Sequence, residues 1–157
     1  MNFKYHLTGE YDCKTDAKGR VRLPSSLIKQ LGEGGSTQFV INRGFEKHLM
    51  LYPRNVWEKE TKKINRRLNI YNNKERQALR YFYRGATELS IDKADRILIP
   101  KSLSEYAGIN KEVVLFAYQD RIEVWAKDEY ELFLSKEPED FASIAEEIFG
   151  NKNEEEE

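Results

Sequence analysis

The sequence predicts an α+β, strand-rich fold made of two similar halves. The main observation is an internal repeat: an Asp-x-x-x-Arg pattern runs from Asp16 to Arg20 and again from Asp92 to Arg96, 76 positions later (92 − 16 = 76). The same offset relates three further pairs of identical residues: Pro24 and Pro100, Leu27 and Leu103, and Gly32 and Gly108. Similarity that stays in step over this length indicates a duplicated supersecondary unit. Because two copies are too few for a solenoid, we expect a pseudo-dimer whose halves bury each other's apolar faces.

Each copy is expected to begin with a tight turn and a short strand. Asp at the first position and Gly at the fourth, as in Asp16–Gly19, favour a type I turn, because the Asp side chain can accept backbone amides and Gly tolerates positive φ. Residues Arg20–Leu23 then alternate with period two, so both arginines should face one way and Val21 and Leu23 the core. The second copy predicts a strand at Arg96–Ile99.

A short amphipathic helix and a β-hairpin should follow each strand. In Pro24–Gly32 the proline suits a first helical turn, three apolar residues form a stripe, and the glycine can end the helix; Pro100–Gly108 repeats the pattern. The hairpins are predicted at Gln38–Asn42 with Leu49–Tyr52 and at Val113–Tyr118 with Arg121–Trp125. The first copy spends about three more residues between its helix and the end of its hairpin.

Helical patterns separate the halves and end the chain. Between the halves they cover Val56–Tyr71 and Lys74–Arg84, and near the end they cover Asp128–Leu134 and Glu139–Phe149. The predicted division is therefore a first half at 8–55, connecting helices at 56–84, a second half at 85–130, a C-terminal helix at 131–150 and a disordered acidic tail at 151–157.

Composition narrows the class of protein. A hydrophobic fraction of 39% over 157 residues supports a packed core. Because no segment resembles a membrane span or a signal peptide, we expect a cytoplasmic protein without a membrane partner. Cys13 with His6 and His48 gives too few ligands for a cysteine/histidine zinc site, so we expect no metal and no other cofactor. No nucleophile elbow, Walker A loop or H-E-x-x-H motif is present, which predicts that the protein is not an enzyme.

Charge is segregated along the chain although the net charge is only −1. Residues 54–84 hold ten Lys/Arg against three Asp/Glu, and residues 127–157 hold three against twelve. A basic face can still attract nucleic acid in such a chain, because salt screens charges beyond roughly 8 Å.

Several motifs together resemble the MraZ family of bacterial transcriptional regulators, which are built from two SpoVT-AbrB-like halves. Besides the two Asp-x-x-x-Arg turns, the motifs are Gly9-Glu10-Tyr11, Leu51-Tyr52-Pro53 followed by Trp57, Gly85-Ala86-Thr87-Glu88, and Glu123-Val124-Trp125. The resemblance covers roughly residues 8 to 149. It implies a swapped-hairpin, β-barrel-like core in each half and a homo-oligomer, an octameric ring. It also implies a nucleoid-associated repressor that binds direct repeats of double-stranded DNA in the promoter of the division and cell-wall gene cluster.

The resemblance assigns DNA reading to Arg20 and Arg96. The chemistry of arginine suits this role, because its guanidinium group can pair with guanine O6 and N7. An arginine beside a rigid turn also loses little conformational entropy when it binds. Other expected site residues are phosphate contacts, Lys14, Lys18 and Arg22, and turn-positioning residues, Asp16, Gly19 and Asp92. In the second copy Ala94, Asp95 and Leu98 replace Lys18, Gly19 and Arg22, so we expect Arg96 to grip DNA less firmly than Arg20.

Simpler interpretations of these charged residues, and a second function, are also open. Arg20 could simply form a solvated ion pair with Asp16, and the basic run Lys59–Arg67 is more typical of a solvated helix face. The alternative function is an AbrB-like antitoxin or protein-interaction module. Two in-phase copies argue against it, because such antitoxins usually carry one half.

Overall fold

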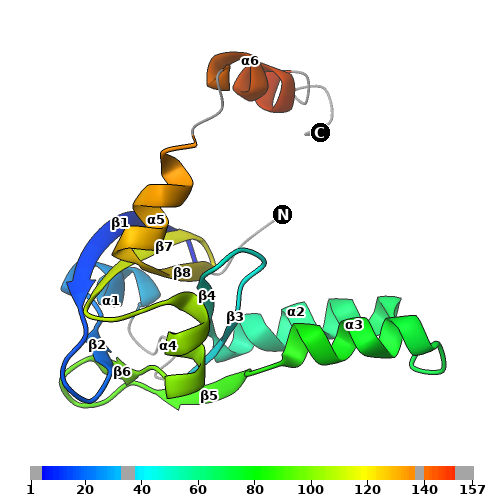
Figure 1. Ribbon diagram of the computed structural model, residues 1–157, viewed down its shortest axis with the longest axis horizontal. Coiled ribbons are helices and arrows are strands. Elements are labelled where there is room, and N and C mark those ends of the chain that lie inside the picture. Colours follow the sequence, from blue (N-terminus) through cyan, green and yellow to red (C-terminus); the bar gives the residue numbers. More distant parts are fainter. Residues whose placement is uncertain (1–4, 33–37, 137–139, 151–157) are drawn as a thin grey trace.

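The computed structural model describes residues 5–32, 38–136 and 140–150 (Figure 1). A six-stranded antiparallel sheet has the order β1-β7-β8-β4-β3-β5, and β2 pairs with β6 in a separate two-stranded ribbon. The strands are β1 (Leu7–Lys14), β2 (Arg20–Arg22), β3 (Gln38–Arg43), β4 (Leu49–Pro53), β5 (Thr87–Ser90), β6 (Arg96–Leu98), β7 (Glu112–Gln119) and β8 (Arg121–Ala126). The helices are α1 (Ser25–Leu31), α2 (Arg54–Arg67), α3 (Asn73–Tyr83), α4 (Lys101–Ala107), α5 (Lys127–Leu134) and α6 (Phe141–Ala145), the last continued by a π-helical segment, Glu146–Gly150. The predicted α+β, strand-rich class is confirmed.

The two halves are interleaved through their strands. The first strand of each half pairs with the third strand of the other, β1 with β7 and β5 with β3. The fourth strands, β4 and β8, pair with each other, and so do the second strands, β2 and β6. The strand order of the large sheet therefore reads the same when the halves are exchanged. The strands are thus exchanged between the halves, as the family resemblance implies, and the halves form the pseudo-dimer that the duplication predicts.

The longer connection of the first half has two components. Phe39 of β3 and Val113 of β7 occupy equivalent positions, because each pairs with the first strand of the opposite half. These two residues are 74 positions apart (113 − 39 = 74), whereas equivalent residues earlier in the halves are 76 apart. In the hairpins, Leu51 occupies the place of Val124, which gives an offset of 73 (124 − 51 = 73). Two extra residues thus precede β3, and one more lies within the β3–β4 hairpin. The helices α1 and α4 keep the full offset of 76.

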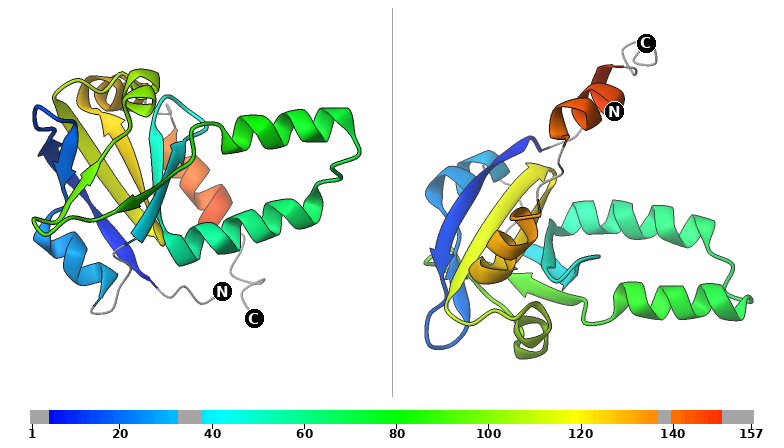
Figure 2. Two further views of the ribbon diagram at one scale, coloured as in Figure 1. Left: turned by 90° about the horizontal axis from the view of Figure 1, so that it is seen from below. Right: turned by 45° about the horizontal axis from the view of Figure 1, so that its top comes forward.

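The helices α2 and α3 form a hairpin that projects from one side of the sheet (Figure 2). At its base Trp57 stacks on Phe82 with ring centroids 5.7 Å apart. The helix predicted at Val56–Tyr71 ends earlier, at Arg67, because Leu68 has extended backbone, and Asn72 starts α3 by accepting the amide of Glu75. Neither α6 nor the segment after it has a buried residue. The predicted acidic tail lies outside the described residues.

One core joins the two halves. Side chains with 0% exposure come from both, for example Val21 and Leu27 from the first and Ile97 and Val124 from the second. Ion pairs across the halves are also duplicated. Arg54 at the start of α2 pairs with Glu88 of β5, and Lys127 at the start of α5 lies 4.0 Å from Asp12 of β1. No helix within the described ranges is long and apolar enough to span a bilayer.

Equivalent leucines should contribute equally to stability. Leu27 and Leu103 are 0% and 2% exposed at matching positions of α1 and α4. Replacing either with alanine should lower the free energy of unfolding by about 2–5 kcal/mol, because each leaves a cavity in the shared core. Leu132→Ala is the control, since Leu132 is 58% exposed and its loss should cost less than about 0.5 kcal/mol. Urea unfolding gives the free energy of unfolding of all three variants. If one of the two core variants lost less than about 1 kcal/mol while the other lost the expected amount, the shared core would be contradicted.

Candidate nucleic-acid interface

The ribbon of β2 and β6 has one buried side and one outward side. Its register pairs Arg20 with Leu98, Val21 with Ile97, and Arg22 with Arg96. Cross-strand partners share a face. Val21 and Ile97 are fully buried, so the other four side chains share the outward face. The two halves therefore build one surface together, although 76 positions separate its arginines Arg20 and Arg96 in the chain.

The two turns hold their arginines in the same way. Asp16 Oδ1 accepts the backbone amides of Lys18 and Arg20, both at 2.9 Å, and Asp16 Oδ2 accepts Arg20 Nε at 2.7 Å. The Asp92 carboxylate does the same for the amides of Ala94 and Arg96 and for Arg96 Nε, with all three distances 2.9 Å. Each arginine is thus anchored through Nε.

The terminal guanidinium nitrogens are the part of each arginine left for a ligand. Within the part of the chain that the structure describes, those of Arg20 have no hydrogen-bond partner, and Nη1 of Arg96 lies 3.8 Å from Asp16 Oδ2. The two side chains are 28% and 30% exposed. A guanidinium fixed at Nε still presents its outer edge, which can pair with two acceptors at once.

Backbone amides keep both turn carboxylates ionised. The amide of Arg20, with help from its side chain and the amide of Lys18, lowers the pKa of Asp16 from 3.8 to about 2. The amide of Arg96 likewise lowers the pKa of Asp92. Both carboxylates therefore hold their arginines throughout the neutral pH range.

The fourth position of each turn is left-handed. Gly19 has φ of 86° and Asp95 has φ of 60°. Aspartate is among the few side chains that enter this region readily, which explains how the second turn forms without glycine. The turns are also tied to the opposite half, because Gly19 O accepts the amide of Ile99 at 3.1 Å and Asp95 O accepts the amide of Leu23 at 2.8 Å.

The ribbon register also sets the neighbours of the two anchored arginines. Arg22 follows Arg20 on the same side of β2 and lies directly opposite Arg96. Each anchored arginine therefore has Arg22 as one neighbour and Leu98 as the other. The turns themselves also differ, because Ala94 and Asp95 replace Lys18 and Gly19.

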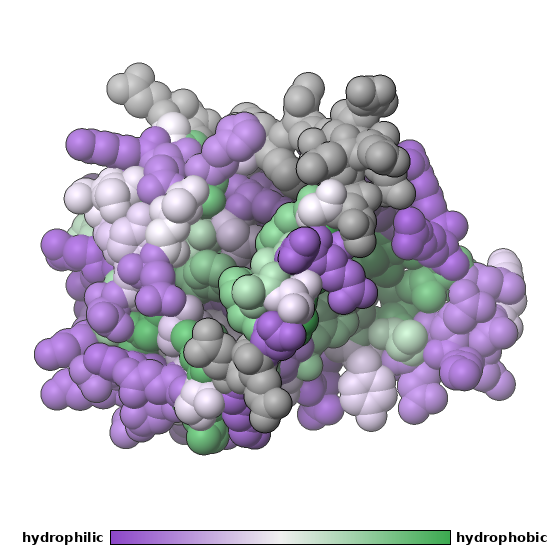
Figure 3. Space-filling view, turned by 90° about the horizontal axis from the view of Figure 1, so that it is seen from above, coloured by the Kyte–Doolittle hydropathy of each residue, from purple (hydrophilic) through white to green (hydrophobic). Residues whose placement is uncertain are grey.

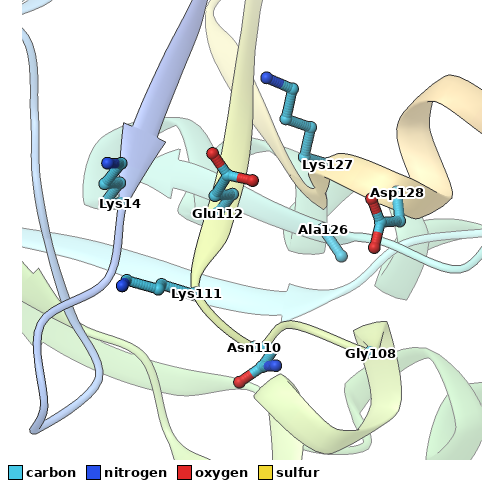
Figure 4. A pocket seen from close by; sticks show the side chains of 8 residues that line it. All are labelled: Lys14, Gly108, Asn110, Lys111, Glu112, Ala126, Lys127 and Asp128. Atoms are coloured by element: carbon cyan, nitrogen blue, oxygen red, sulfur yellow. The ribbon is translucent and has the colours of Figure 1, made fainter.

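The predicted lysines lie in two separate hollows. Lys18 lines a hollow beside the first turn, together with Leu98 and Lys101. Lys14 lines another, at the end of β1, with Lys111 and Lys127, and Glu112 lies between Lys14 and Lys127 (Figure 4). Lys111 was not predicted from the sequence; it lies beside the first half because Glu112 pairs with Lys14 and because its carbonyl accepts the amide of Thr15 at 2.8 Å.

Comparisons with known proteins agree with the duplication. A family model described as "MraZ protein, putative antitoxin-like" matches residues 6–81 and 82–152. A protein named transcriptional regulator MraZ from Christiangramia forsetii is 43% identical over 147 residues, which cover 93% of this chain and 94% of that protein. Its namesakes from Flavobacterium psychrophilum and Clostridium acetobutylicum are 40% and 36% identical; the matches cover 96% and 78% of this chain and 96% and 82% of those proteins.

The lowered pKa of Asp16 predicts how the stability of the first turn changes at low pH. The folded-state pKa is about 2 against an ordinary 3.8, so ionised Asp16 stabilises the turn fully above pH 4. That stabilisation is lost as the pH falls through 2. A carboxyl-carbon NMR titration should place the Asp16 midpoint near 2. A midpoint at or above 3.8 would show that the turn does not hold this carboxylate in solution, and Asp16→Asn should remove the resonance and confirm the assignment.

Proposed function

This chain belongs to the MraZ family, and we propose that it is a DNA-binding transcriptional regulator that reads DNA with the β2–β6 ribbon. The observation that carries the proposal is the outward face on which Arg20, Arg22 and Arg96 gather from both halves. The names of its relatives support the regulatory role. The proposed activity needs no catalytic group and no cofactor.

The proposed binding site on the DNA is the major groove. That groove is about 12 Å wide and admits a two-stranded β-ribbon. Arg20 and Arg96 would each offer two nitrogens to guanine O6 and N7, while their aspartates hold the side chains in place. The phosphate contacts proposed for Lys14, Lys18 and Arg22 would set the register of the protein on the duplex.

The proposed target is a set of direct repeats in the promoter of the division and cell-wall gene cluster, where the protein would act as a repressor. It would work in the cytoplasm, associated with the nucleoid. The matching family description also names an antitoxin-like role. We favour the DNA function, because the relatives that cover most of the chain are named transcriptional regulators.

We further propose that the protein is a homo-oligomer, an octameric ring. The C-terminal helical segment exposes apolar side chains at helical spacing, with Phe141 59%, Ile144 39% and Ile148 45% exposed. Apolar patches also interrupt the charged surface when the molecule is seen from the end that carries α6 (Figure 3). This end is remote from the ribbon in Figures 1 and 2, so contacts made there leave the proposed DNA face free. If this apolar end contacts a different surface of the next subunit, the contact is head-to-tail, and a series of such contacts can close into a ring.

Loss of either anchored arginine should weaken DNA binding. Arg20→Ala should cost about 1–3 kcal/mol of binding free energy per lost base contact. Arg96→Ala should cost less, because Asp95 adjoins Arg96 and its Nη1 lies 3.8 Å from Asp16. Arg54→Ala is the matched control, since Arg54 is also an ion-paired surface arginine but lies on α2.

Fluorescence anisotropy with a duplex from the promoter measures the affinity, and thermal unfolding checks that the variants are folded. Equal losses for the two ribbon variants would refute the difference between the halves. Unchanged affinity in both would refute the reading role.

Oligomerisation should make binding multivalent. If one subunit engages one repeat, a duplex with three or four spaced repeats should bind at least about tenfold more tightly than a duplex with one. Light scattering at micromolar concentration should give the mass of an assembly. A monomer mass, or equal affinity for one repeat and for several, would contradict the ring.

A further inference from the structure

Leu98 is an apolar side chain on an otherwise cationic face. It is 52% exposed, lies directly across the ribbon from Arg20, and follows Arg96 on the same side of β6. Its equivalent in the first half is Arg22, which belongs to the same face. Single exposed leucines are common on protein surfaces. This one is unusual because the other three positions of the face are arginines.

The side chain of Leu98 also forms part of a hollow. It leans over the first turn, where its Cδ1 lies 4.0 Å from the position that a Cβ on Gly19 would occupy. The hollow has a volume of about 470 Å³ and is lined by the first turn, the end of β6 and the start of α4. Lys18 and Lys101 contribute to its lining from opposite halves of the chain. An apolar surface thus lies beside two ammonium groups.

We propose that Leu98 recognises thymine, and that Lys18 and Lys101 bind the adjacent backbone phosphates. The inference rests on the proposed DNA-binding function and adds a base to it. The C5-methyl of thymine is the apolar group that base pairs present in the major groove. A duplex seated on Arg20 and Arg96 would cover Leu98, and the contact with a methyl group would remove apolar surface of both from water. The ribbon would then read thymine next to guanine.

The test compares thymine with uracil, which differ only by this methyl group. Duplexes are first selected from a random pool with the wild-type protein, and the selected sequence is made with thymine or with deoxyuridine. The wild type should bind the uracil duplex about fourfold more weakly, the effect expected for one buried methyl group. Leu98→Ala should bind both duplexes equally, with the affinity of the wild type for uracil DNA.

Two control variants separate this role from others. Leu132→Ala removes a leucine of similar exposure on α5 and should keep the fourfold preference for thymine. Lys18→Ala should weaken binding to both duplexes alike, because it removes only a phosphate contact. Equal binding of both duplexes by the wild type, or a preserved preference in Leu98→Ala, would overturn the proposal. Failure of the wild type to select any duplex would instead overturn the DNA-binding function itself.

Discussion

The antiparallel pairing of β2 with β6 is the interaction on which the rest of the site depends. Each strand is only three residues long, and the two strands come from opposite halves of the chain. Pairing buries Val21 against Ile97 and so turns the arginines outward. The two turns are then joined to the opposite strands through the carbonyls of Gly19 and Asp95. A site built this way exists only when both halves are folded together.

Duplication followed by divergence gives this surface a direction. If the second half repeated the first, the outward face would carry four arginines related by a twofold axis and would suit a symmetric DNA site. Replacement of one of them by Leu98, and of Gly19 by Asp95 in the second turn, makes the two ends of the ribbon different. An asymmetric surface suits an asymmetric DNA sequence, which is consistent with the direct repeats that we propose as its target.

Sequence reasoning located most local structure because its determinants are local. The helices predicted within Pro24–Gly32 and Pro100–Gly108 are present as Ser25–Leu31 and Lys101–Ala107. The repeat predicted the pseudo-dimer, whereas the swapped pairing came from the family resemblance. What the sequence could not supply was register between distant strands. The placement of Arg22 opposite Arg96 and the burial of His48, stacked 4.5 Å from Trp125, depend on partners far away in the chain. The early end of α2 depends on backbone at Leu68 that its apolar pattern did not reveal.

A dimethyl sulfate protection experiment on a promoter duplex, which reports access to guanine N7 in the major groove, tests whether the β2–β6 ribbon reads bases there. If the ribbon reads bases, the wild-type protein should protect guanines at regularly spaced positions, one set in each repeat. Protection should disappear with the double variant Arg20→Ala, Arg96→Ala at concentrations where the DNA remains bound. Protection confined to adenine N3 in the minor groove, or guanine protection that survives the double variant, would contradict base reading by the ribbon.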